Sequence, residues 1–165
     1  MGLDSVKTLL HIGCGKQGIE ALPHLDFERE WRQVRVDIDP DVEPDIVANM
    51  TNMAVIDGGS VDIVYSKHNL EHLEFHEIPL ALREFHRVLK PTGFLICRCP
   101  DLARIAERLA TVDLEETLGV ASMDDGTRFE VALIDMIFGA RTEIADGHGF
   151  RRHRPGFTSE SLTRH

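Results

Sequence analysis

The stretch that decides the fold is LLHIGCGKQG, residues 9–18, in which an apolar run leads into three glycines. Gly13, Gly15 and Gly18 have the G-x-G-x-x-G spacing that lets the backbone approach a nucleotide when a strand precedes it. The pattern alone is weak, because glycine turns are common. Asp37 ends the next predicted strand, 19 residues beyond Gly18. An acid there accepts hydrogen bonds from both hydroxyls of a ribose, so the sequence predicts a ligand that contains one.

Composition limits the partners and the location. The chain has 165 residues, enough for one domain with a sizeable core, and a net charge of -10. Such an acidic chain disfavours broad contact with phosphate backbones, so no nucleic-acid partner is predicted. No apolar run is long enough to cross a membrane, and no signal segment is present, so no membrane partner is predicted either. The three cysteines, an odd number, are interpreted as reduced thiols of a cytoplasmic protein.

Apolar runs predict a layered α/β fold. The predicted strands are residues 6–12, 33–37, 45–48, 61–65 and 93–99. The clearest helix covers residues 78–89, with an apolar face of Ile78, Leu82, Phe85 and Leu89. A briefer helix over residues 16–22 is stopped by Pro23. Strands that alternate with helices or loops pair in parallel, and their ligands bind beyond the carboxyl ends of the strands.

The pattern changes after the fifth predicted strand. Helices are predicted at residues 102–109 and 131–138, with a polar loop at 119–128 between them, a loop at 145–156 and a final helix capped by Thr158. Asp101 either contacts substrate or caps the first of these helices, and capping is the favoured interpretation. The chain is therefore predicted to be a single domain, 1–165, with a cofactor-binding core at 1–102. Residues 103–165 would form a helical and loop part on the substrate side, or a cover.

Four segments, in chain order, resemble the motifs of class I S-adenosylmethionine-dependent methyltransferases. They are LHIGCGKQG, VRVDIDPDVEPDIVANM, VDIVYSKHNLEHL and LREFHRVLKPTGFLI. The chain is most similar to small bacterial members that act on small molecules or glycans. The resemblance covers roughly residues 8–102 and, more weakly, the segment GHGFRRHRPGFT. It implies a Rossmann-like parallel sheet and S-adenosylmethionine as the cofactor, and it agrees with the short helix after the glycines, which suits a pyrophosphate poorly.

The resemblance also implies which positions bind the cofactor. Those at its methionine part and methyl end are Gly13, Cys14, Gly15, Ser66, Lys67 and His68. Those at its ribose and adenine are Asp37, Ile38, Asn49 and Met50. The family often has an acid at the position of His11, where it helps to hold the cofactor's amino group. A neutral His11 can still accept a hydrogen bond from that amino group, whereas a charged His11 would repel the cofactor. Alternatively, His11 does not contact the cofactor and packs under the glycine loop.

Histidines after the fourth predicted strand are candidates for proton transfer. Methyl transfer from a sulfonium requires mainly alignment, but a hydroxyl or ammonium acceptor must also lose a proton, and histidine suits that task near neutral pH. His72 is the first candidate for the catalytic base and His68 the second, with Glu71 orienting a histidine or serving the fold. Catalysis by proximity alone is the alternative.

A histidine pair and a basic cluster each have two interpretations. His72 and His76 have the i, i+4 spacing of a metal-binding pair. Pro79 places His76 outside any continuous turn with His72, so no metal is predicted. The basic cluster RRHR, residues 151–154, is either a solvated loop or a flap that recognises an anionic substrate.

The sheet of the resembled class normally continues into an antiparallel hairpin at its edge. Here the chain stops after GFTSESLTRH, so the fold is expected to lack that C-terminal hairpin and to leave residues 93–99 at the sheet edge. An open apolar edge invites pairing. We therefore expect that residues 129–139 or a second copy in a homodimer cover it, or that the chain is a shortened form of a longer protein.

The leading functional hypothesis is methyl transfer from S-adenosylmethionine to an oxygen or nitrogen of a small molecule or glycan. One alternative is a non-catalytic domain that binds S-adenosylmethionine or S-adenosylhomocysteine. The other alternative is a nicotinamide-dependent oxidoreductase, which is disfavoured because the helix after the glycines is broken at Pro23.

Overall fold

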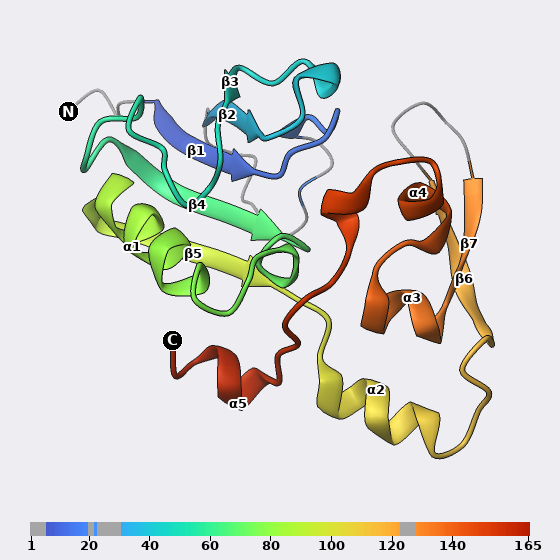
Figure 1. Ribbon diagram of the computed structural model, residues 1–165. Helices are drawn as coiled ribbons and strands as arrows, with labels where there is room; N and C mark the ends of the chain where they lie inside the picture. Colours follow the sequence, from blue (N-terminus) through green and yellow to red (C-terminus); the bar gives the residue numbers. More distant parts are fainter. Residues whose placement is uncertain (1–5, 20–21, 23–30, 123–127) are drawn as a thin grey trace. The chain divides into compact units, whose positions relative to one another are not determined.

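The computed structural model describes residues 6–19, 22, 31–122 and 128–165 (Figure 1). The chain divides into two compact units. The first consists of Met1–Lys67 and Pro79–Arg98, and the second of His68–Ile78 and Cys99–His165. No helix among the described residues has the length and apolar character needed to cross a membrane.

A five-stranded parallel sheet forms the first unit. Its strands are β1 (Lys7–Ile12), β2 (Trp31–Asp37), β3 (Ile46–Val47), β4 (Val61–Lys67) and β5 (Leu89–Arg98), in the order β3-β2-β1-β4-β5. The central strands β1 and β4 are the most apolar and bury Leu9, Leu10, Ile63 and Val64 almost completely. All five predicted strands are present, and the Rossmann-like α/β fold class is confirmed.

The strand order places the ligand site. From β1 the chain proceeds to β2 and β3 on one side, and then returns to add β4 and β5 on the other. Ligands of doubly wound sheets bind at such a reversal, beyond the carboxyl ends of the two strands that flank it. The glycine turn follows β1 directly, and Ser66 and Lys67 end β4 beside it, with Ile12 and Ser66 in register.

Helix α1 (Ile78–Val88) differs slightly from its prediction. Its buried positions are Ile78, Ala81, Phe85 and Val88. Leu82 and Leu89 were expected on this face but are only half-buried, and Leu89 already begins β5. The predicted helix over residues 16–22 is not seen at residues 16–18, while residues 20–21 and Pro23 lie outside the described residues.

The second unit contains short helices and a hairpin. Its elements are α2 (Leu102–Leu109), β6 (Thr117–Ser122), β7 (Arg128–Ala132), α3 (Leu133–Phe138), α4 (Arg141–Ala145) and α5 (Ser159–Leu162). The predicted caps are confirmed, because Asp101 accepts a hydrogen bond from the Ala103 N–H, and Thr158 accepts one from the Ser161 N–H. The helix predicted from residue 131 begins only at Leu133, because β7 continues to Ala132.

The predicted polar loop at residues 119–128 is wrong for its described part. Residues 119–122 belong to β6 and Arg128 opens β7, paired in antiparallel fashion, while residues 123–127 lie outside the described residues. Leu118 and Val120 alternate with other residues in β6, as do Phe129 and Val131 in β7, but both runs are short and the DDG sequence between them is typical of a loop.

The antiparallel pair does not join the parallel sheet. Within the described part of the chain, β6 and β7 form a separate two-stranded sheet, and β5 is an edge of the five-stranded one, as expected. Phe94 on β5 is 54% exposed. A homodimer and a cover formed by residues 129–139 stay predictions.

Candidate functional site

The turn after β1 is closed against the end of β2. Gly13 and Gly15 have φ angles of 60° and 51°, in the left-handed region where glycine avoids the steric cost that a Cβ brings. The Gly13 N–H donates to the Val36 carbonyl at 2.8 Å, and the Gly15 N–H donates to Asp37 Oδ2 at 2.9 Å. The glycine spacing therefore builds a turn whose backbone is held by the residue predicted to bind the ribose.

Asp37 is fixed in place but retains acceptor capacity. Its Oδ1 accepts a hydrogen bond from the Asp39 N–H at 3.0 Å, so both carboxylate oxygens are held by backbone donors. Each oxygen has lone pairs for a further donor, such as a ribose hydroxyl. The next residue, Ile38, is 53% exposed, an apolar side chain beside the site.

Arg35 supports the glycine turn and was not among the residues predicted from the sequence. Its Nη2 donates to the carbonyls of Gly15 at 2.6 Å and Val42 at 3.0 Å, and its Nη1 donates to that of Glu43 at 3.0 Å. The guanidinium thus joins the glycine turn to the 3-10 helix η2 (Pro40–Val42). A charged residue within a strand indicates a specific partner, but β2 also contains Arg32 and Asp37, and the sequence does not show that Arg35 bonds to carbonyls 7, 8 and 20 residues away.

His11 is buried beneath the glycine turn, at 2% exposure. Its Nδ1 lies 3.0 Å from Gln33 Nε2, and its ring meets that of Tyr65 edge-on. Burial, aided by the charges of Arg35 and Lys67 and opposed by that of Asp37, lowers the pKa of His11 to about 4. The ring is therefore neutral at pH 7, so Nδ1 accepts the hydrogen bond from Gln33.

The neutrality of His11 predicts a pH-dependent stability. The unfolded chain binds a proton at His11 below its ordinary pKa of 6.5, whereas the folded chain does so only near pH 4. The stability that the neutral His11 ring contributes is complete above pH 6.5 and is lost as the pH falls to about 4. This loss is about 3 kcal/mol, at about 1.4 kcal/mol per pKa unit. Urea unfolding should therefore show a loss of stability between pH 7 and 4 that is about 3 kcal/mol smaller in His11→Gln than in the parent.

Other titrating groups act equally in both proteins, so the difference between parent and variant isolates His11. The exposed His86 on α1 provides the matched control, and His86→Gln should retain the full pH dependence. An identical dependence in His11→Gln and the parent would contradict a neutral buried ring.

The remaining cofactor candidates of the first unit lie at strand ends. Ser66 is buried at the end of β4, and Lys67 follows it. After β3, the Oδ1 of Asn49 accepts hydrogen bonds from the Thr51 N–H and hydroxyl at 2.9 Å, so this exposed residue shapes a turn next to the half-buried Met50. Burial and the nearby Asp37 carboxylate raise the pKa of Cys14 to about 11, which makes its thiol a packing group.

The second unit brings acid and histidine side chains together. His68 has a φ angle of 57°, unusual for a residue with a Cβ, and its Nδ1 lies 3.1 Å from Glu71 Oε1. Glu71, on the 3-10 helix η3 (Leu70–His72), is 1% exposed. Burial raises the pKa of Glu71, but hydrogen bonds, above all that from His68, lower it further, so its pKa lies below its usual value.

A second segment, residues 152–154, is bonded to η3. His72 Nδ1 lies 3.1 Å from the Arg152 carbonyl oxygen, the Arg154 N–H donates to the Glu71 carbonyl at 2.8 Å, and the Arg154 guanidinium donates to the His72 carbonyl. Arg151 and Arg154 form ion pairs with Glu143 at 2.6 Å and Glu74 at 2.9 Å. Two of the three arginines in the basic cluster are therefore paired with acids of the same unit.

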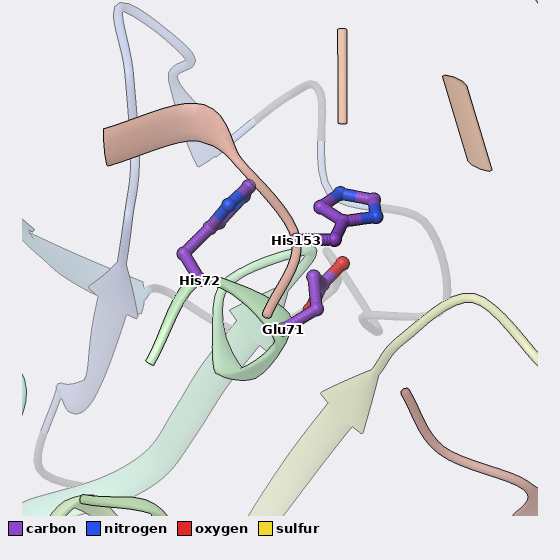
Figure 2. Close-up of side chains that lie close together, drawn as sticks. All are labelled: Glu71, His72 and His153. Carbon is purple, nitrogen blue, oxygen red and sulfur yellow. The ribbon is translucent and has the colours of Figure 1, made fainter. Parts of the chain in front are cut away.

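His153 completes a cluster with Glu71 and His72 (Figure 2). Its Nδ1 lies 3.2 Å from the Met136 carbonyl oxygen of α3, and its ring centroid is 5.1 Å from that of His72. Burial lowers the pKa of both histidines. His76 is exposed and does not belong to this cluster. His153 could not be assigned to this cluster from the sequence, because only the fold brings it to η3.

Comparison with known families and structures gives one family and several similar folds. The family model described as a methyltransferase domain matches residues 10–97. The structure of an S-adenosylmethionine-dependent methyltransferase from Mesorhizobium loti is similar to that of this chain, with 17% sequence identity and a TM-score of 0.52. The match covers 96% of this chain and 71% of the other protein. The DhpI–SAM–HEP complex is 14% identical with a TM-score of 0.54, over 96% and 67%.

A third structure, the PH0226 protein from Pyrococcus horikoshii OT3, is 22% identical with a TM-score of 0.48, over 76% of this chain and 67% of that protein. A search of curated protein sequences found no match. The two structures with TM-scores above 0.5 establish a shared fold, and the family match covers the strands and loops that build the glycine turn.

Proposed function

We propose, since this chain belongs to the methyltransferase-domain family, that it transfers a methyl group to an oxygen or nitrogen of a small molecule or glycan. The protein is an S-adenosylmethionine-dependent methyltransferase, and S-adenosylmethionine is its cofactor. The observation that carries the proposal is the glycine turn bonded to Asp37 at the reversal of the strand order. The acceptor class and a cytoplasmic location stay predictions from the sequence.

The proposed cofactor site uses the carboxyl ends of β1 to β4. The turn from Gly13 to Gly15 would lie under the methionine part, and Asp37 would bind the ribose between its two backbone donors. Ile38 would flank the adenine, with Asn49 and Met50 at the adenine edge. Ser66, Lys67 and His68 would face the methionine and methyl end. Arg35 would hold the turn in shape without touching the cofactor.

Either of two histidines would take the acceptor's proton. The Nδ1–H of His72 donates to the Arg152 carbonyl, which leaves the Nε2 lone pair available. His68 has the same arrangement, with Nδ1 bonded to Glu71 Oε1 and a side chain that is 44% exposed. Because His72 is held from two segments of the chain, it remains the first candidate for the base.

The proposal is tested by binding and transfer experiments on the purified protein. Calorimetric titration should show binding of S-adenosylmethionine and S-adenosylhomocysteine, and no heat with NAD. Labelled methyl groups should then pass from S-adenosylmethionine to one member of a panel of metabolites and oligosaccharides, and the product should identify the acceptor atom. Cofactor binding without transfer to any acceptor would favour the non-catalytic alternative, and NAD binding would contradict the cofactor site.

A further inference from the structure

We propose that Glu71, His72 and His153 bind a divalent transition-metal cation. One ligand atom from each of the three residues lies within 4.8 Å of the others. Figure 2 shows the three side chains gathered from η3 and the 152–154 segment. Two imidazoles and one carboxylate form a ligand set that zinc and other first-row metal ions take in proteins.

Both histidines are oriented as metal ligands usually are. The Nδ1–H of His72 donates to the Arg152 carbonyl, and that of His153 donates to the Met136 carbonyl. Each ring therefore keeps its lone pair on Nε2 and is held in place by a backbone acceptor. Metal-bound histidines typically donate their other ring N–H to such an acceptor, which fixes both tautomer and direction.

The carboxylate of Glu71 provides an independent observation. Glu71 is 1% exposed, and its Oε1 is bonded to His68 Nδ1. Its Oε2 is buried and has no hydrogen-bond partner within the described part of the chain. A buried carboxylate oxygen without a partner is costly, and a cation beside it would remove that cost. The His68 hydrogen bond would then hold the carboxylate as it coordinates the metal.

The basic residues around the cluster do not oppose a cation as strongly as their number implies. Arg151 pairs with Glu143, and Arg154 pairs with Glu74, so each positive charge is offset by an acid. Arg152, whose carbonyl accepts from His72, has an exposed side chain in water, where screening is strong. The three ligands themselves bring one negative charge.

The geometry requires only a small adjustment. Ligand atoms bonded to zinc at about 2.0–2.1 Å in a tetrahedron lie about 3.3 Å apart, so side-chain shifts of about 1 Å close the site. Three protein ligands leave a coordination position open, as catalytic metal sites do and structural ones do not. Water or an oxygen of the acceptor would fill it, a role for the acceptor that rests on the proposed function.

The cation and a proton would compete for the same lone pair of His72. His72 therefore cannot be both metal ligand and base at one moment, and with the cation bound His68 would be the remaining histidine for proton transfer. The two roles of His72 can be distinguished, because only its role as a metal ligand makes the turnover rate depend on the presence of metal.

The test is direct binding of Zn²⁺ to the full chain after treatment with EDTA and removal of the chelator. Calorimetry should show one equivalent bound, and Co²⁺ should give a visible absorption spectrum of a low-coordinate site. His153→Ala and Glu71→Gln should each weaken Zn²⁺ binding by about 10–100-fold or more. His86→Ala, which removes an exposed histidine from α1, should leave it unchanged. Circular dichroism would verify that each variant is folded.

A parent protein that binds no Zn²⁺ or Co²⁺ would overturn the inference, as would binding that His153→Ala leaves unchanged. Titration with S-adenosylhomocysteine on the same samples separates the two proposals. Cofactor binding without metal binding would reject only the cation site, while metal binding without cofactor binding would reject only the proposed function.

Discussion

Replacement of Asp37 by alanine is expected to weaken S-adenosylhomocysteine binding by about 10²–10⁴-fold. The carboxylate would accept hydrogen bonds from two ribose hydroxyls, and hydrogen bonds to a charged group are worth about 1.5–3 kcal/mol each. The variant also loses the hydrogen bond to the Gly15 N–H, which holds the turn under the cofactor. Calorimetric titration of the parent and the variant measures the loss.

Two further variants sharpen this test. Asp37→Asn keeps one side-chain oxygen and the size of the residue but removes the charge. Its affinity for S-adenosylhomocysteine should therefore lie between those of the parent and the alanine variant. Asp41→Ala, at an exposed acid four residues along in η2, changes the net charge equally and should leave affinity unchanged. Equal affinity in Asp37→Ala and the parent would show that the ribose lies elsewhere.

The sequence predicted the parallel sheet well because a strand buried on both faces is a continuous apolar run. Residues 9–12 and 61–65 come close to such runs, interrupted only by His11 and Asp62, and they lie in the central strands β1 and β4 of the sheet. The glycine turn was predictable for a similar local reason, since positive φ angles at Gly13 and Gly15 require residues without a Cβ. Both the apolar strands and the glycine turn are therefore determined by residues close together in the sequence.

The parts that were not predicted depend on contacts between distant segments. Arg35 is one of three charged residues in β2, and only the fold shows that it bonds to the carbonyl of Gly15. His153 lay in a segment predicted as a loop, and its place beside His72 depends on hydrogen bonds between that segment and η3, such as the one from the Arg154 N–H to the Glu71 carbonyl. The hairpin of β6 and β7 was missed because its alternating apolar residues, such as Val120 and Val131, form only two short runs on either side of a DDG sequence that is typical of a loop.

His72→Ala is expected to lower turnover on a hydroxyl acceptor by about 10²–10⁴-fold, the usual contribution of a positioned acid–base group. Cofactor affinity should be nearly unchanged, because His72 is not among the proposed cofactor contacts. The structural reason is the fixed ring, whose Nδ1–H is held by the Arg152 carbonyl so that only Nε2 can act. Single-turnover rates with S-adenosylmethionine and the identified acceptor would separate the chemical step from binding.

Matched variants and a chelator distinguish the roles of His72. His76→Ala, at an exposed histidine four residues further along the chain, should retain full turnover. If His72 is the base, EDTA should leave the parent's rate unchanged and His153→Ala should have a much smaller effect than His72→Ala. If His72 acts as a metal ligand, EDTA, His153→Ala and His72→Ala should all lower the rate, and added Zn²⁺ should restore only the parent treated with EDTA. Unchanged turnover in His72→Ala would reject both roles and leave catalysis to the alignment of methyl group and acceptor, which can itself contribute about 7–11 kcal/mol.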